Sequence, residues 1–133
     1  WSDYELTMFQ AAVDEQIDGM LVGPLSYPNN DPGHISSVSS IFITDLLRKK
    51  MGFSGVIMSD DMRMQAIAST VGVGEGAISF VEAGGDMILI GRYADKQTAA
   101  FEALYDALDS GRLSRSRLEE SVYRILIMKG FEP

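Results

Sequence analysis

Short, wholly apolar segments alternate along the chain with longer segments in which apolar residues recur every three or four positions. Three of the short segments are typical of buried strands, at residues 20–22, 56–58 and 87–90. Segments with helical spacing precede and follow them, so the predicted order is α-β-α-β-α-β-α-α. Strands that alternate with helices predict an α/β fold with a parallel sheet and right-handed crossovers. Because these strands are apolar throughout, we expect both faces of the sheet to be covered.

Capping signals and helix breakers place the ends of the predicted helices. The helices begin at Ser2, at Ser39 or Ser40, near Glu75, near Lys96 and at Ser116. The first and last of these serines each precede a glutamate by three positions, which is the spacing of a capping box. The first helix is expected to continue to Ile17, and Gly52 and Gly111 are expected to end the second and fourth.

The length of the chain fits a single domain, residues 1–133, that is large enough to enclose a hydrophobic core. A complete barrel of eight βα units needs about 250 residues, so this chain has the length of half a barrel. Residues 23–38 form a predicted loop rich in Pro, Asn, Gly and Ser. It is longer than most connections, which is typical of functional or mobile loops.

Two adjacent carboxylates, Asp60 and Asp61, follow the second predicted strand. In parallel α/β proteins the carboxyl ends of the strands are where chemistry takes place, so a carboxylate here is a candidate catalytic group. Successive side chains at a strand end point to opposite sides, so one carboxylate can face a pocket while the other braces a loop. The alternative is that both simply cap the turn that follows.

Three further side chains are candidates for ligand contacts. His34, the only histidine, could act as a general acid or base, or could be a surface residue of the long loop. Arg92 follows the third strand and could bind an anionic or hydroxyl-rich ligand, or pair with a surface acid. Met64 could line a pocket near Asp60, although methionine usually fills gaps in a core. The sequence has no cluster of metal ligands, and we expect no metal or cofactor.

Composition narrows the classes of partner. The net charge of −8 argues against nucleic acid and anionic membranes, both of which need a basic surface. The absence of cysteine excludes disulfides and thiolate chemistry and fits a reducing, cytoplasmic compartment. No apolar run approaches the roughly 20 residues of a membrane span. The first residue is Trp1 rather than methionine, so we expect a processed chain or one cut from a longer protein.

Residues 46–67, LLRKKMGFSGVIMSDDMRMQAI, resemble glycoside hydrolase family 3, and in particular its single-domain β-N-acetylglucosaminidases. Residues 82–91, EAGGDMILIG, are similar to a strand of that family downstream of this motif. Residues 6–28 resemble a family segment upstream of it. The resemblance implies a (β/α)₈ barrel, of which this chain matches the last three βα units and the terminal helices. It also implies that Asp60 is the catalytic nucleophile. Asp61, in place of an aromatic residue, favours the N-acetylglucosaminidase branch.

The implied reaction is retaining hydrolysis of terminal β-N-acetylglucosaminides through a covalent glycosyl intermediate on Asp60. In that branch the acid/base is a histidine on an earlier loop, near a Lys-His pair, and His34 does not match it. Gly23-Pro24 also stands where relatives often carry Ser-His. Without general acid/base assistance the rate would fall by about 10²–10⁴-fold.

We therefore expect a partner for the half barrel, either a second copy or a chain that supplies the first half, because two sheet edges are left unpaired. Two alternatives stay open. One is a non-catalytic half barrel that serves in assembly or binds sugar weakly. The other is an open α/β ligand-binding domain unrelated to sugar.

Overall fold

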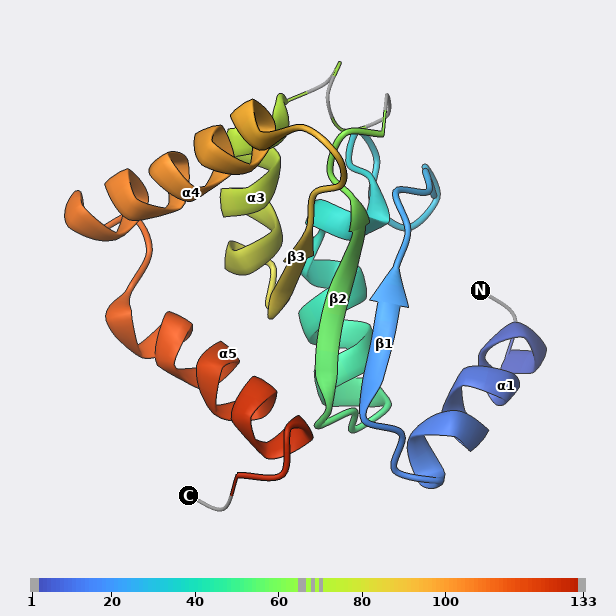
Figure 1. Ribbon diagram of the computed structural model, residues 1–133. Helices are drawn as coiled ribbons and strands as arrows, with labels where there is room; N and C mark the ends of the chain where they lie inside the picture. Colours follow the sequence, from blue (N-terminus) through green and yellow to red (C-terminus); the bar gives the residue numbers. More distant parts are fainter. Residues whose placement is uncertain (1–2, 65–66, 68, 70, 132–133) are drawn as a thin grey trace.

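The computed structural model describes residues 3–64, 67, 69 and 71–131 (Figure 1). In chain order the elements are α1 (Asp3–Asp14), β1 (Gly19–Val22), η1 (Ser36–Val38), η2 (Ile41–Lys50), β2 (Val56–Asp61), α3 (Val73–Glu82), β3 (Met87–Leu89), α4 (Ala94–Asp109) and α5 (Arg115–Met128). The three strands are parallel and lie in the order β1-β2-β3. The α/β fold and the parallel sheet predicted from the sequence are confirmed.

The central strand β2 is longer than its apolar run predicted. It pairs with β1 in regular register, but its pairing with β3 shifts between Met58 and Asp61. Ser59 lies at this shift, fully buried, and its hydroxyl accepts a 3.0 Å hydrogen bond from the Leu89 N–H. A side chain thus satisfies a backbone donor where the ladder is irregular. The strand therefore runs to Asp61, and the prediction that Asp60 lies in a following loop is wrong.

One face of the sheet is covered by η2 and α3. The largest buried side chains of this core are Ile43 from η2, Ile57 from β2 and Phe80 from α3. On the opposite face, Leu21 and Leu89 are 50% and 40% exposed. The expectation that both faces are covered is therefore wrong for the described residues. Apolar strands indicate that burial is favourable, but they do not supply the element that covers them.

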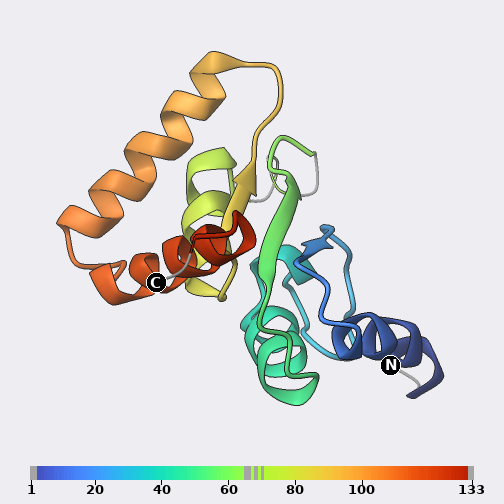
Figure 2. The same cartoon turned by 60° about the horizontal axis from the view of Figure 1, so that its bottom comes forward.

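The outer helices lie at the two sides of the sheet. Figures 1 and 2 show α1 beyond β1, and α4 and α5 beyond β3. A second apolar cluster joins α3 and α4 through Ile78, Val81, Ala107 and Leu113, and Leu118 of α5 packs against it. At the other side, Gln10 of α1 donates a 3.2 Å hydrogen bond to the carbonyl of Met51, which follows η2.

Several predicted helix ends differ from the observed ones. The first helix stops at Asp14 and not at residue 17, because Gln16 adopts a left-handed conformation with φ 57°. Ser40 precedes η2 without a side-chain cap, and the Ser39 hydroxyl donates instead to Asp31. The capping box predicted at Ser116 is wrong: the cap is the hydroxyl two residues earlier, which accepts from the Arg117 N–H at 3.1 Å. Ser2, the other predicted cap, lies outside the described residues.

Gly52, with φ 74°, follows η2 as predicted, and Gly111, with φ 77°, follows α4. Within the long loop, η1 and an isolated bridge between Ser26 and Ile35 add local order. Across the part of the chain that the structure describes, no helix combines the length and apolar character needed to cross a membrane.

Candidate functional site

Asp60 lies at the carboxyl end of the central strand, the position that the sequence singled out. Its Oδ1 accepts a 2.7 Å hydrogen bond from the N–H of Asp61. Its Oδ2 faces the end of β1, where a Cβ placed on Gly23 would lie 4.0 Å from it. Within the described ranges no other donor reaches this carboxylate. One oxygen is thus oriented by the backbone, and the other is left for a ligand.

Asp61 points away from β1, toward the segment after β3. Arg63 binds its carboxylate through the backbone N–H at 3.0 Å, through Nε at 3.0 and 3.1 Å, and through Nη2 at 2.5 Å. These hydrogen bonds from Arg63 hold the pKa of the Asp61 carboxyl below its usual range, against the opposing effect of burial. Asp61 is therefore held in an ion pair, whereas Asp60 accepts, among the described residues, a single backbone hydrogen bond.

The brace extends to the turn between β3 and α4. The guanidinium of Arg63 lies over the ring of Tyr93, 5.1 Å from its centroid. Between Leu89 and Tyr93 the chain passes Gly91, where a Cβ would lie only 3.1 Å from Asp61 Oδ2. A side chain at this position would require the Asp61 carboxylate or the Arg63 guanidinium to shift, so glycine suits this close approach. Arg92 follows with its side chain exposed.

The predicted contact residue His34 lies in the loop after β1. It is 64% exposed, and its Nδ1 is 2.8 Å from Asp31 Oδ1. Asp31 also accepts a 2.5 Å hydrogen bond from the Ser39 hydroxyl. This hydrogen bond lowers the pKa of Asp31, and the hydrogen bond with His34 adds a smaller effect in the same direction. Ser36 secures the other end of the loop by donating to the Gly23 carbonyl at 2.6 Å. The loop beside Asp60 is thus held by its own polar side chains.

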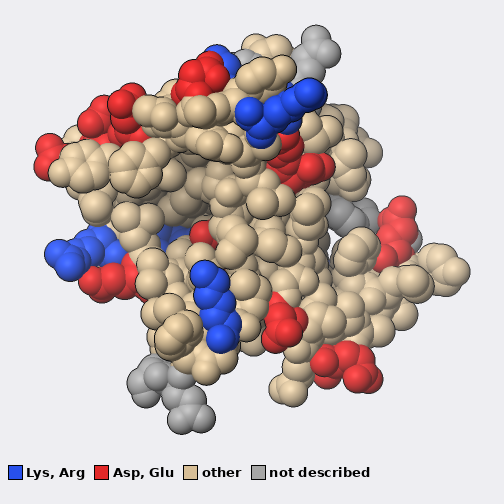
Figure 3. Space-filling model, viewed as in Figure 1, with Lys and Arg blue, Asp and Glu red and all other residues tan. Residues whose placement is uncertain are grey.

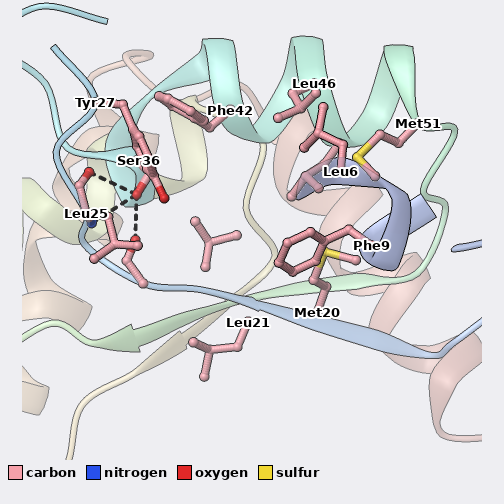
Figure 4. Close-up of a pocket in the computed structure, with 13 residues that line it drawn as sticks. Leu6, Phe9, Met20, Leu21, Leu25, Tyr27, Ser36, Phe42, Leu46 and Met51 are labelled. Carbon is pink, nitrogen blue, oxygen red and sulfur yellow. Dashed lines mark hydrogen bonds between the residues drawn. The ribbon is translucent and has the colours of Figure 1, made fainter. Parts of the chain in front are cut away.

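An apolar cavity of about 140 Å³ lies beneath this loop, between α1, β1 and η2 (Figure 4). Figure 4 shows Leu6, Phe9, Met20 and Leu46 around it, with Ser36 and its hydrogen bonds at one end. A cavity of this size and lining suits one apolar group rather than a polar sugar ring. Gly23 lines the cavity and also faces Asp60, so the cavity borders the site without forming it.

The structure thus brings Asp60, Asp61 and Arg92 to the carboxyl edge of β2 and β3, and Met64, 42% exposed, follows in the turn after β2. His34 is held by Asp31 on the neighbouring loop. Acidic and basic side chains lie close together toward the top of Figure 3, where the strands end in Figure 1. The ligand roles predicted for these residues stay predictions.

Sequence reasoning missed the groups that support the two carboxylates, which are Ser59, Arg63 and Tyr93. An arginine two positions after an aspartate was the available signal for Arg63, because that spacing lets the side chain return to the carboxylate. Tyr93 gave no signal, since its contact with Arg63 joins two different loops. Among the described residues, no group of three or more His, Asp or Glu side chains is arranged to hold a metal ion.

Comparison with known proteins adds a family. Residues 2–128 match the model of the glycosyl hydrolase family 3 N terminal domain. The chain is 31% identical over 122 residues to a β-hexosaminidase of Nitrosomonas eutropha, covering 90% of this chain and 35% of that protein. It therefore spans about a third of the length of that curated relative.

Solved structures of family 3 enzymes resemble the chain in both sequence and fold. A family 3 β-N-acetylglucosaminidase from Paenibacillus sp. FPU-7 is 38% identical and superposes with a TM-score of 0.92, over 95% of this chain and 24% of that one. The β-N-acetylglucosaminidase of Thermotoga maritima is 30% identical, with a TM-score of 0.84 over 94% of this chain and 28% of that one. The three-stranded unit thus corresponds to part of a family 3 barrel domain.

Proposed function

The chain belongs to glycosyl hydrolase family 3, and we propose that it carries the nucleophile of a retaining β-N-acetylglucosaminidase site. Asp60 is that nucleophile. The observation that carries the proposal is its geometry: a carboxylate at the end of the central strand, with Oδ1 oriented by a backbone N–H and Oδ2 unpaired among the described groups. The names of the similar proteins support the choice of sugar.

The chemistry follows from a free carboxylate at an anomeric carbon. An Asp60 oxygen forms a bond to the anomeric carbon while the glycosidic C–O bond breaks, and the leaving oxygen takes a proton from an acid. Water then attacks the same carbon and gives a proton to the conjugate base of that acid while the bond to the Asp60 oxygen breaks, so that the sugar is released and the carboxylate is restored. The neighbouring charge does not oppose this, because Asp61 is paired with Arg63. In this proposal Asp61, Met64, Arg92 and His34 contact the substrate at the rim.

The unit is best placed as the last three βα units of the barrel. Two helices, α4 and α5, follow β3 in succession, whereas within the regular repeat of a barrel one helix separates each strand from the next. This break in the alternation supports the placement. The sequence pattern around Asp60 points to the same place.

The proton donor and the sugar contacts then come from outside these three units. The described residues near Asp60 include no acid that is hydrogen-bonded to it. The partner that we propose is a chain or segment that supplies the rest of the barrel, with a second copy as the alternative. The open edges of β1 and β3 and the exposed apolar side chains of α1 and α5 support this.

A second candidate function is a non-catalytic half barrel that serves in assembly or binds sugar weakly. The observation that favours it is the absence, among the described contacts, of an acid partner for Asp60. It predicts binding without turnover, whatever is added to the chain.

Complementation separates the two functions. The chain is mixed with the remaining strands of a family 3 barrel, and hydrolysis of a β-N-acetylglucosaminide is followed. The proposed function predicts turnover that is lost in Asp60→Asn and kept in Asp45→Asn, a matched change on the exposed side of η2. A complex that forms but never turns over would instead support the assembly function.

A further inference from the structure

The turn between β3 and α4 is strained at Arg92. This arginine has a φ of 66°, and the N–H of Tyr93 donates a 2.8 Å hydrogen bond to the carbonyl of Gly91. A hydrogen bond across one residue closes a γ-turn, and positive φ at its centre makes it the rare, strained form. A residue with a Cβ adopts this conformation only where its surroundings impose it, and such outliers cluster at functional sites.

The surroundings do impose it, because the turn is fixed on both sides. Before it, the backbone of Gly91 hydrogen-bonds to the carboxylate of Asp61. After it, the ring of Tyr93 packs under the guanidinium of Arg63. Gln97 of α4 closes the frame by donating from Nε2 to the carbonyl of residue 90 at 2.9 Å. The brace that neutralises Asp61 therefore also holds Arg92 in its strained conformation.

The side chain held in this way carries an unpaired charge. The other arginines all pair with carboxylates: Arg48, Arg63, Arg112, Arg115, Arg117 and Arg124. Within the described residues, the guanidinium of Arg92 has no ion pair or hydrogen bond. The chain has 19 acidic residues and a net charge of −8, so partners are abundant. An arginine that has no carboxylate partner and lies in a strained turn at the same sheet edge as Asp60 has N–H donors available to bind a ligand.

We propose that Arg92 binds an anionic substituent of the sugar ligand: a carboxylate, sulfate or phosphate group. The inference rests on the proposed function, since it places this anion beside Asp60. A guanidinium suits the group because its fork of N–H donors matches paired oxygens. The net negative charge of the chain disfavours anions in general, so we expect the attraction to Arg92 to be local and to weaken with salt.

The test compares charged and neutral ligands by amide NMR titration, at low salt, of the chain combined with the remaining strands of a family 3 barrel. N-acetylglucosamine 6-sulfate is compared with N-acetylglucosamine, which places the anion on the glycone side. The 4-carboxyphenyl β-N-acetylglucosaminide is compared with its methyl ester, which places it on the aglycone side. Inorganic sulfate alone is the probe for an anion site independent of sugar.

Three variants isolate the contribution of residue 92. Arg92→Asn removes the charge and keeps a residue that tolerates positive φ. Arg92→Lys keeps the charge. Arg115→Asn is the matched control, because it removes the same charge from an exposed position on α5.

We expect one charged ligand to bind about fivefold tighter than its neutral counterpart, the effect of one exposed charge-assisted contact. The preference should vanish in Arg92→Asn and persist in Arg92→Lys and Arg115→Asn. The ligand pair that shows this preference identifies the side of the glycosidic bond on which the anion lies.

Equal binding of charged and neutral ligands, or a preference that survives Arg92→Asn, overturns the inference and leaves the proposed function standing. Sulfate binding that needs Arg92 while no sugar binds supports the anion site and contradicts the proposed function. Absence of all binding contradicts both.

Discussion

Asp60 and Asp61 are adjacent in sequence, yet they have different contacts, and we propose that they have different roles. Asp61 is bound on both oxygens by Arg63, whereas Asp60 receives one hydrogen bond from the part of the chain that the structure describes, from a backbone N–H. Two free carboxylates in succession would repel each other, and pairing one of them with an arginine removes that repulsion. The pair therefore combines a reactive group with a fixed one, and the fixed one also anchors the turn that holds Arg92.

Acid should destabilise the chain through its paired carboxylates. The pKa values of Asp31, Asp61 and Glu75 are lowered, mainly by hydrogen bonds from Ser39, Arg63 and Arg112 respectively. A carboxyl with a lowered folded pKa contributes stability above its unfolded pKa, and this contribution is lost as the pH falls through the folded value. We expect the free energy of unfolding, measured in urea, to decline below about pH 4. Each contribution is small because these groups lie near solvent.

The contribution of Asp61 to this decline in the free energy of unfolding can be measured separately. Asp61→Asn cannot change its charge, so its unfolding free energy should fall less steeply with acid than that of the native chain. Asp45→Asn, on the exposed side of η2, should leave the slope unchanged. Equal slopes for Asp61→Asn and the native chain would contradict the assigned pairing.

At the residue scale the sequence located the reactive group but not its supports. Asp60 was predictable as a candidate because it follows closely on a recognisable apolar run, although the strand extends past that run to Asp61. Arg63, Ser59 and Tyr93 were not, since their contacts depend on how β2, β3 and the following loop come together. The register shift that buries Ser59 has no counterpart in the hydrophobic pattern.

At the scale of elements, Asp86 at the start of β3 joins four segments. Its side chain is fully buried, accepts from the N–H of Ile57 at 2.9 Å, and pairs with Arg48 of η2. From α5, the Ser121 hydroxyl and Arg124 Nη1 each donate to it at 2.8 Å. This network fixes η2 and α5 to the amino-terminal edge of the sheet, opposite Asp60.

Removing the charge of Asp86 should be strongly destabilising. Asp86→Asn leaves partly buried arginines without their buried carboxylate, and breaking such a network typically costs about 3–5 kcal/mol. Urea unfolding would measure the loss. Asp45→Asn is the control, because its pair with Lys49 is exposed and should contribute only about 0.5 kcal/mol. A loss below about 1 kcal/mol for Asp86→Asn would show that the network adds little to stability.

Element order and the parallel sheet were predictable because apolar runs and glycine breakers recur clearly along the chain. Helix ends were less so. Ser116 has the capping-box spacing, but the loop after α4 closes earlier, and the hydroxyl of Ser114 reaches the free N–H first. The mistaken end of the first helix has a similar origin, since nothing in its spacing marks Gln16 as left-handed.

At the scale of the whole molecule, the described residues leave two edges of the sheet unpaired and one of its faces open. The exposed apolar side chains include Tyr4 and Met8 on α1, Leu21 on β1, and Tyr123 and Ile127 on α5. Large uncharged areas separate the charged groups on the face shown in Figure 3. Exposed apolar surface next to open strand edges is typical of an incomplete assembly. The sequence predicted the number of strands, but no pattern within one chain specifies what pairs with its edges.

We expect the isolated chain to associate with itself or with a complementary barrel segment. Light scattering after size exclusion should show a mass that rises with concentration. Leu21→Lys places a charge on the open face and should reduce association, whereas Glu102→Lys on the outer side of α4 should not. A monomer at all concentrations that also ignores the complementary segment would contradict this expectation.

The central claim is that Asp60 is a nucleophile, and one measurement tests it most directly. The chain, alone and with its complementary segment, is incubated with an activated 5-fluoro N-acetylglucosaminyl donor, and its intact mass is recorded. The good leaving group removes the need for an acid, and the fluorine slows release of the sugar. We predict a mass increase of one glycosyl group that is lost in Asp60→Asn and kept in Asp45→Asn. No adduct in either mixture, or an adduct that survives Asp60→Asn, would contradict the claim.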